Sequence, residues 1–111
     1  MTTMQHQDLA DGRWFRLSLA LQLGNIGSEV SRVLKARAAG NEERMQSAFV
    51  RCLELFDLTL CDPRHRERLR ELCRVREVLC DFVAGDNQYA STPQDLDRYF
   101  TCFAIAGRRG Q

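Results

Sequence analysis

The first group of residues that could do chemistry is a line of polar side chains along one face of a predicted helix. Its members recur at spacings of four, three, four and three residues: Ser18, Gln22, Asn25, Glu29 and Arg32. That spacing places all of them along one stripe of a helix. Because their side chains donate and accept hydrogen bonds, the stripe is a candidate binding surface.

Arg76 is the second candidate, because it interrupts the apolar stripe of its own predicted helix. Its charge either reaches solvent along the side-chain stem or is buried and paired. For the buried alternative we predict an ion pair with Glu29 that crosses the centre of the fold, supported by Gln22 and Asn25. These residues and Arg32 form the predicted binding site, although such a network more often fixes the register of a fold than does chemistry.

A third candidate is a row of arginines at intervals of four residues: Arg66, Arg70 and Arg74. Glutamates of the same segment can pair with them, which describes a solvated, salt-bridged face. The functional alternative is contact with RNA or another phosphate-bearing ligand. The row lacks the interleaved aromatic residues that a single-strand binder uses.

No catalytic or metal-binding pattern accompanies these candidates. His6 and His65 are the only histidines, and neither lies in a Glu-x-x-His or His-Glu-x-x-His sequence. We expect His65 to be exposed in the first turn of its helix. The sequence therefore predicts no metal and no cofactor, and no catalysis is evident.

Cysteines are the remaining reactive side chains. None of them forms a Cys-x-x-Cys pair, and their number is odd: Cys52, Cys61, Cys73, Cys80 and Cys102. Most fall at apolar helical positions, so we interpret them as small buried hydrophobic residues in a reducing cytosol.

Four helices must position these residues. Helical periodicity and capping residues predict segments at 13–39, 42–60, 63–83 and 93–107, preceded by a disordered arm over 1–12. Asp11 is the expected N-cap of the first helix, and Gly40 follows its last periodic residue as a C-cap. The architecture predicted for the single domain over 13–108 is an all-α, up-down-up-down four-helix bundle. In the one long loop, Tyr89 is expected to pin the chain to the core.

Two glycines, Gly24 and Gly27, interrupt the first predicted helix. Each costs about 1 kcal/mol relative to alanine. We therefore expect this helix to pack closely against a neighbour there.

Composition limits the classes of function. The chain has 111 residues, which is one domain by length, and its net charge of +1 gives no reason to expect nucleic acid or an anionic membrane. No apolar run reaches about eighteen residues, and the polar N-terminus lacks the apolar region of a signal peptide. We expect a cytoplasmic protein that does not contact a membrane.

Three stretches together resemble a family of small, all-helical prokaryotic proteins of unassigned function: QLGNIGSEVSR at 22–32, FVRCLELFDLTLCDPRHRERLRELCRVREVLCDF at 49–82 and GDNQYAST at 85–92. The resemblance implies a compact helical fold and a cytosolic location, and it brings no activity. A looser likeness is to the HEPN helical bundles, many of which are ribonucleases or nucleotide-binding partners. Their arginine followed after four to six residues by histidine is incomplete here, because no histidine follows Arg98.

Two functions follow from these observations. The first is a helical bundle that acts by self-association, as a homodimer, or by binding a protein partner. This hypothesis is based on the number of apolar positions, which exceeds what the core of one four-helix bundle can bury. Leu58, Val75 and Val78 are examples of the extra positions, which could face a second chain. The alternative is a HEPN-like protein that binds RNA or a nucleotide phosphate through the arginine row.

Overall fold

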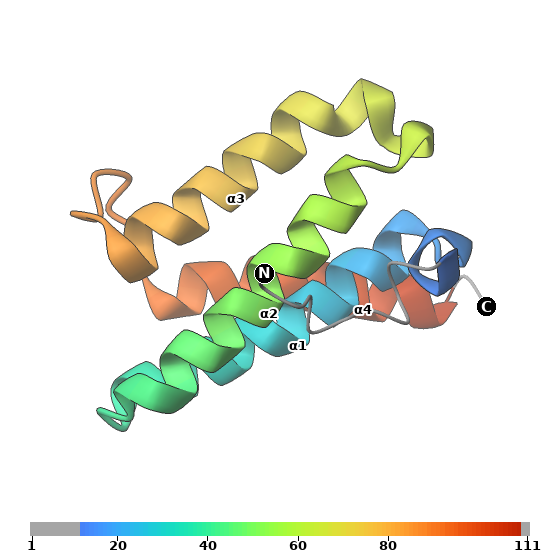
Figure 1. The fold of residues 1–111 in the computed structure, drawn as a ribbon. Helices are drawn as coiled ribbons and strands as arrows, with labels where there is room; N and C mark the ends of the chain where they lie inside the picture. The colour runs from blue at the N-terminus through green and yellow to red at the C-terminus, as the bar shows by residue number, and fades with distance from the viewer. Residues whose placement is uncertain (1–11, 110–111) are drawn as a thin grey trace, which may run out of the picture.

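The computed structural model describes residues 12–109, with side chains described over 12–102. Its described part is all-α. In chain order the elements are η2 (Trp14–Arg16), α1 (Leu19–Ala38), α2 (Glu42–Leu60), η3 (Pro63–Arg68), α3 (Leu69–Ala84) and α4 (Pro93–Arg109), where η denotes a 3-10 helix (Figure 1). The all-α class and the four helices are thus confirmed, and the alternating order of helix directions stays a prediction.

Helix α1 is the central element of the fold. It packs most extensively against α4 and α2, whereas α3 contacts α2 and has no extensive contact with α1 (Figure 1). The turn between α1 and α2 is short, and Gly40 makes it with a φ of +71°, a left-handed conformation that glycine adopts without strain. The C-terminal half of α1 therefore lies beside the N-terminal half of α2.

Close packing between α1 and α4 is centred on Gly27. A Cβ atom built at this position would lie 2.5 Å from the Cβ of Phe100. Only glycine lets the two helices approach this closely, so the predicted close contact is confirmed at Gly27.

The core is built from apolar faces of all four helices. Helix α2 buries one such face: Met45, Phe49, Cys52 and Phe56. Against it pack Ile26 and Val33 of α1, Leu79 and Phe82 of α3, and Leu96 and Phe100 of α4. Helix α3 thus contributes apolar side chains to the core although its backbone stands away from α1.

The first and third helices begin differently from the prediction. The segment 13–39 is divided at Leu17, which is extended at ψ 147°, and α1 begins after Ser18, whose Oγ accepts a hydrogen bond from the backbone N–H of Leu21. The segment 63–83 is divided into η3 and α3, with His65 in a non-helical conformation. The expected cap at Asp11 and the arm up to residue 11 lie outside the described residues.

The loop after α3 is held to the surface of α3. The Asp81 carboxylate accepts the backbone N–H groups of Gln88 and Tyr89 at 2.9 and 3.1 Å. The Tyr89 hydroxyl donates to Glu77 at 3.1 Å, and 43% of Tyr89 is exposed. The prediction that Tyr89 pins the loop to the core is therefore wrong, because its contacts are polar and superficial.

Across the described residues, none of the helices has the length and apolar content that crossing a membrane requires.

Candidate functional site

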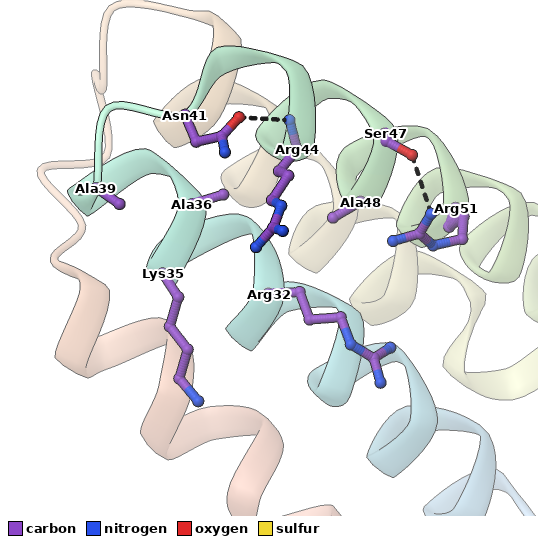
Figure 2. A pocket seen from close by; sticks show the side chains of 9 residues that line it. All are labelled: Arg32, Lys35, Ala36, Ala39, Asn41, Arg44, Ser47, Ala48 and Arg51. Carbon is purple, nitrogen blue, oxygen red and sulfur yellow. Dashed lines mark hydrogen bonds between the residues drawn. The ribbon is translucent and has the colours of Figure 1, made fainter.

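A basic pocket lies where the end of α1 meets the start of α2 (Figure 2). Its volume is about 570 Å³, within the range of small-molecule sites. The lining residues are Arg32, Lys35, Ala36 and Ala39 on the α1 side, and Asn41, Arg44, Ser47, Ala48 and Arg51 on the α2 side. We call this site the α1–α2 pocket.

Helical spacing explains why these residues meet. On α2 the lining residues recur every three or four positions, which keeps them on one face, and those of α1 do the same. The alanines between the two basic rows are short, and Ala36 and Ala48 are buried. They leave room between the helices over which four cationic side chains extend.

At one end of the pocket, a carboxylate partly compensates the charge of two arginines. Glu29 is buried, with 9% of its side chain exposed, and it accepts from Arg32 Nη1 at 2.7 Å and from Arg51 Nε at 3.3 Å. Arg51 also donates to Ser47 Oγ at 2.9 Å. This end therefore combines two guanidinium groups with one carboxylate.

The other end carries cations without counter-charges. In the described part of the chain, neither Lys35 nor Arg44 forms an ion pair, and both are exposed. Figure 2 shows the Arg44 side chain extending from α2 toward α1. The backbone N–H of Arg44 donates to the side-chain oxygen of Asn41, which caps the helix. Unpaired cations that share a pocket can bind an anion, and guanidinium groups match phosphate oxygens in geometry.

The residues predicted as one binding site do not converge. Asn25 is exposed and donates to the backbone carbonyl of Leu21. Glu29 pairs with Arg32, and Arg32 lines the α1–α2 pocket. Gln22 belongs to a different cluster at the start of α1.

The predicted ion pair between Glu29 and Arg76 is wrong. Arg76 Nε instead contacts Asp57 Oδ1 of α2 at 3.2 Å, in a pair whose side chains are 33% and 58% exposed. The physical reason is the position of α3, which packs on α2 and leaves Arg76 on the outer side of that contact. Arg76 thus reaches solvent. The arginine of another helix that pairs with Glu29 is Arg51 of α2.

The arginine row of η3 and α3 is exposed, as a solvated face would be. Arg74 lies under the ring of Tyr89, with its Cζ 5.6 Å from the ring centroid. The loop thereby supplies an aromatic side chain that the row lacks in sequence. Arg66 and Arg70 form no ion pair among the described residues.

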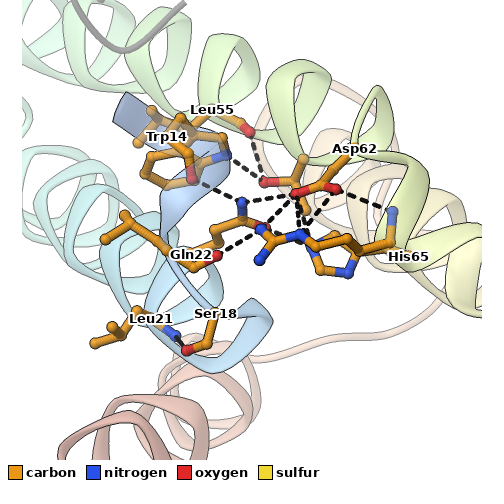
Figure 3. A network of polar contacts seen from close by, with 10 residues as sticks. Trp14, Ser18, Leu21, Gln22, Leu55, Asp62 and His65 are labelled. Carbon is orange, nitrogen blue, oxygen red and sulfur yellow. Dashed lines mark hydrogen bonds and ion pairs between the residues drawn. The ribbon is translucent and has the colours of Figure 1, made fainter. Parts of the chain in front are cut away.

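A buried polar network joins η2, α1, α2 and η3 at the opposite end of the α1–α2 pair (Figure 3). Gln22 is its centre: its amide nitrogen donates to the Trp14 carbonyl at 3.0 Å and to Asp62 Oδ2 at 3.2 Å. Its amide oxygen lies 2.7 Å from His65 Nε2, and because the amide nitrogen already donates twice, the imidazole must donate here. Trp14 Nε1 donates to Thr59 Oγ1 at 2.9 Å, which in turn donates to the Leu55 carbonyl. We call this set the Asp62 network.

Charge in the Asp62 network is compensated from the surface. Arg64 donates to both oxygens of Asp62, and the hydrogen bonds from this guanidinium hold the pKa of the carboxyl well below its usual range. Burial lowers the pKa of His65, which favours the neutral imidazole. The expectation that His65 is exposed is therefore wrong, because the non-helical turn of η3 directs the ring inward.

The cysteines differ in their exposure to solvent. Cys52 is buried, as predicted, and burial raises the pKa of its thiol to about 12. Cys80 is half-buried, whereas three others are exposed, so the prediction is wrong for Cys61, Cys73 and Cys102. All five are free thiols.

Of the four cations around the pocket, the sequence predicted only Arg32 as a site residue, and Lys35, Arg44 and Arg51 were missed. Arg44, Ser47 and Arg51 form a polar line on α2 that faces Arg32 and Lys35 of α1. The spacing of that line is visible in the sequence. Its meaning depends on the short turn at Gly40, which brings the two basic lines together.

No protein-family model, no curated protein and no solved structure matches this chain. The resemblance described from the sequence thus stays a prediction, and the functional argument depends on the geometry of the site.

Proposed function

We propose that this protein is a binding protein that recognises a phosphate-bearing ligand in the α1–α2 pocket. The observation that carries the proposal is the local excess of cations: four basic side chains surround the pocket and one carboxylate compensates them. Since the whole chain has a net charge of only +1, this excess is a local feature. Among the described residues that line the pocket there is no imidazole, thiol or carboxylate, because Glu29 lies behind Arg32 and Arg51, so the lining offers binding groups without an evident general base.

The test measures the binding of orthophosphate and pyrophosphate by calorimetry at low salt. We expect the double variant Lys35→Gln/Arg44→Gln to lose at least about tenfold in affinity, because both unpaired cations are removed. Affinity should also fall as salt is added, since the contacts are ionic.

The matched control is Arg66→Gln/Arg70→Gln, which removes the same charge from the remote arginine row. It should change affinity less than about twofold. Equal losses in both double variants would show that general charge drives the binding and would overturn the proposed site. A wild-type protein that binds neither probe would overturn the proposed function.

A second candidate is supported by the contact between Arg74 and Tyr89. An exposed arginine row next to an aromatic ring has the elements of a site for RNA, in line with the HEPN-like alternative. If this row binds RNA, the Arg66→Gln/Arg70→Gln variant should lose RNA affinity while Lys35→Gln/Arg44→Gln keeps it.

Self-association as a homodimer, or a protein partner, stays a prediction with reduced support. Of the residues that motivated it, Leu58 is buried, and Val75 and Val78 are half-buried against the core. Size-exclusion chromatography with light scattering decides it, because a concentration-independent monomer would exclude the homodimer.

A further inference from the structure

Glu29 is a buried anion at the edge of a site that attracts anions. Only 9% of its side chain is exposed, and two arginines of the pocket hold it at 2.7 and 3.3 Å. Its position is fixed by the packing of α1 against α2. The α1–α2 pocket therefore has an inner end, lined by Arg32 and Arg51 with Glu29 held behind them, and an outer end, lined by Lys35 and Arg44.

The two ends differ in the charge that they offer. The outer end presents two cations, which match a phosphoryl group with a charge of roughly −1.5 to −2 at neutral pH. The inner end presents two guanidinium groups and one carboxylate. A second phosphoryl group directed there would have to compete with Glu29 for the arginines, and it would lie beside a fixed like charge.

We infer that Glu29 is a specificity-determining residue that restricts the pocket to ligands with a single phosphoryl group. The inference rests on the proposed function and deepens it, because it names the class of ligand. Chains of phosphoryl groups, such as pyrophosphate and tripolyphosphate, are disfavoured because a second group would meet two arginines that Glu29 already holds, whereas the cations of the outer end have no carboxylate partner among the described residues.

The rest of the pocket fits a phosphate monoester. Its volume of about 570 Å³ exceeds what one phosphoryl group fills, so the ligand has a body as well as a charge. Among the described residues that line the pocket, none is aromatic and could stack on a base, and small apolar side chains, Ala36, Ala39 and Ala48, lie beside the cations. The shared chemistry is one phosphoryl group on a small or extended carrier, either a small metabolite or a phosphorylated peptide.

The experiment compares orthophosphate, pyrophosphate and tripolyphosphate on three proteins: the wild type, Glu29→Gln and the remote control Glu67→Gln. Glu67 is exposed on η3 and does not line the pocket, so its substitution changes the net charge equally. We expect the wild type to bind the longer anions no more than about threefold tighter than orthophosphate. In Glu29→Gln the affinity for pyrophosphate should rise about tenfold, with orthophosphate changed less than about threefold.

A wild type that prefers pyrophosphate by about tenfold or more would overturn the inference and leave the proposed function standing. An equal rise in Glu67→Gln would also overturn it, since the effect would then come from net charge. A wild type that binds none of the three probes overturns the proposed function and the inference together.

Folding is controlled by a second variant and by unfolding curves. Glutamine has nearly the same size as glutamate and keeps one acceptor oxygen, so Glu29→Gln retains one of the two arginine contacts and should fold. Glu29→Asp keeps the charge and shortens the side chain, and it should retain the discrimination against pyrophosphate. Discrimination lost in both variants would show that the shape of the inner end matters and its charge does not, which overturns the inference.

Two further probes distinguish the sources of the phosphoryl group: glycerol phosphate and a short phosphoserine peptide. The tighter of the two identifies the carrier. If the wild type binds pyrophosphate but neither glycerol phosphate nor the phosphoserine peptide, the ligand is not a phosphate monoester and the assignment is overturned.

Discussion

The Asp62 network and the α1–α2 pocket lie at opposite ends of the same helix pair and use polar residues in opposite ways. In the network, a buried carboxylate, amide, imidazole and indole all find partners, and Arg64 brings a compensating charge from the surface. In the pocket, basic side chains outnumber the carboxylate that faces them, and two of the cations are unpaired.

This difference separates a structural role from a binding role. Buried polar groups stabilise a fold only when their hydrogen bonds are made, which is the condition of the Asp62 network. Exposed cations with no partner contribute little to stability and remain available to a ligand. Substitutions at the two ends should therefore affect different quantities.

The largest expected effect is on stability, from Asp62→Asn. The substitution leaves Arg64 and Gln22 without the charged acceptor that they share. We expect a loss of about 2–3 kcal/mol in the free energy of unfolding, because the charged acceptor is lost from buried hydrogen bonds while Arg64 can still reach solvent. Urea denaturation measures it, and phosphate affinity of the folded protein should not change.

Asp57→Asn is the matched control for that measurement, because Asp57 is 58% exposed and pairs with Arg76 at the surface. Its cost should stay below about 1 kcal/mol. If the two substitutions cost the same, the Asp62 network is not the structural element that the comparison requires.

A smaller loss is expected from the hydrogen bond that Trp14→Phe removes from Thr59, apart from the cost of the cavity that the smaller ring leaves. The lost hydrogen bond should cost about 1 kcal/mol, because the Thr59 hydroxyl loses its donor but keeps its bond to the Leu55 carbonyl. A double-mutant cycle with Thr59→Val isolates the coupling, which should be about 1 kcal/mol. Additive effects would show that η2 is held by packing alone.

The pH dependence of stability should also originate in the network. Burial lowers the pKa of His65 from its usual 6.5. As the pH falls, the unfolded chain therefore binds a proton at His65 before the folded protein does. The free energy of unfolding is highest above pH 6.5 and decreases as the pH drops below that value. Asp62 has a lowered pKa, so its contribution is present above its usual 3.8 and is lost only at lower pH. His65→Gln should remove the first loss and keep the second, as urea unfolding between pH 8 and pH 3 would show. A wild type of constant stability from pH 7 to pH 5 would contradict this assignment.

Much of the fold could be predicted from local signals. Helix α2 spans the predicted residues 42–60, because its Asn41 cap and its apolar face are both local features. The break at Leu17 could not be found in this way. It depends on Trp14, whose indole is held by Thr59 forty-five positions later in the chain.

The residues of the candidate site were harder to predict from the sequence, because the site also depends on contacts between helices. Periodicity assigns residues to faces within one helix, but it does not say which helices face each other. Arg76 was assigned to Glu29 on the assumption that the first and third helices face each other across a central seam, whereas α3 packs on α2. Arg51 carries the same chemistry as Arg76 and meets Glu29 because the Gly40 turn places α2 beside α1.

The smallest expected effect is the stability change in Lys35→Gln/Arg44→Gln. Both side chains are exposed and have no ion-pair partner among the described residues, so the free energy of unfolding should change by less than about 0.5 kcal/mol. Removing two like charges from one pocket can even raise stability slightly, because it relieves their repulsion from Arg32 and Arg51. Urea unfolding at low salt, where this repulsion is strongest, is the sensitive measurement. A loss above about 1 kcal/mol would mean that these cations support the fold, and the contrast with the Asp62 network would fail.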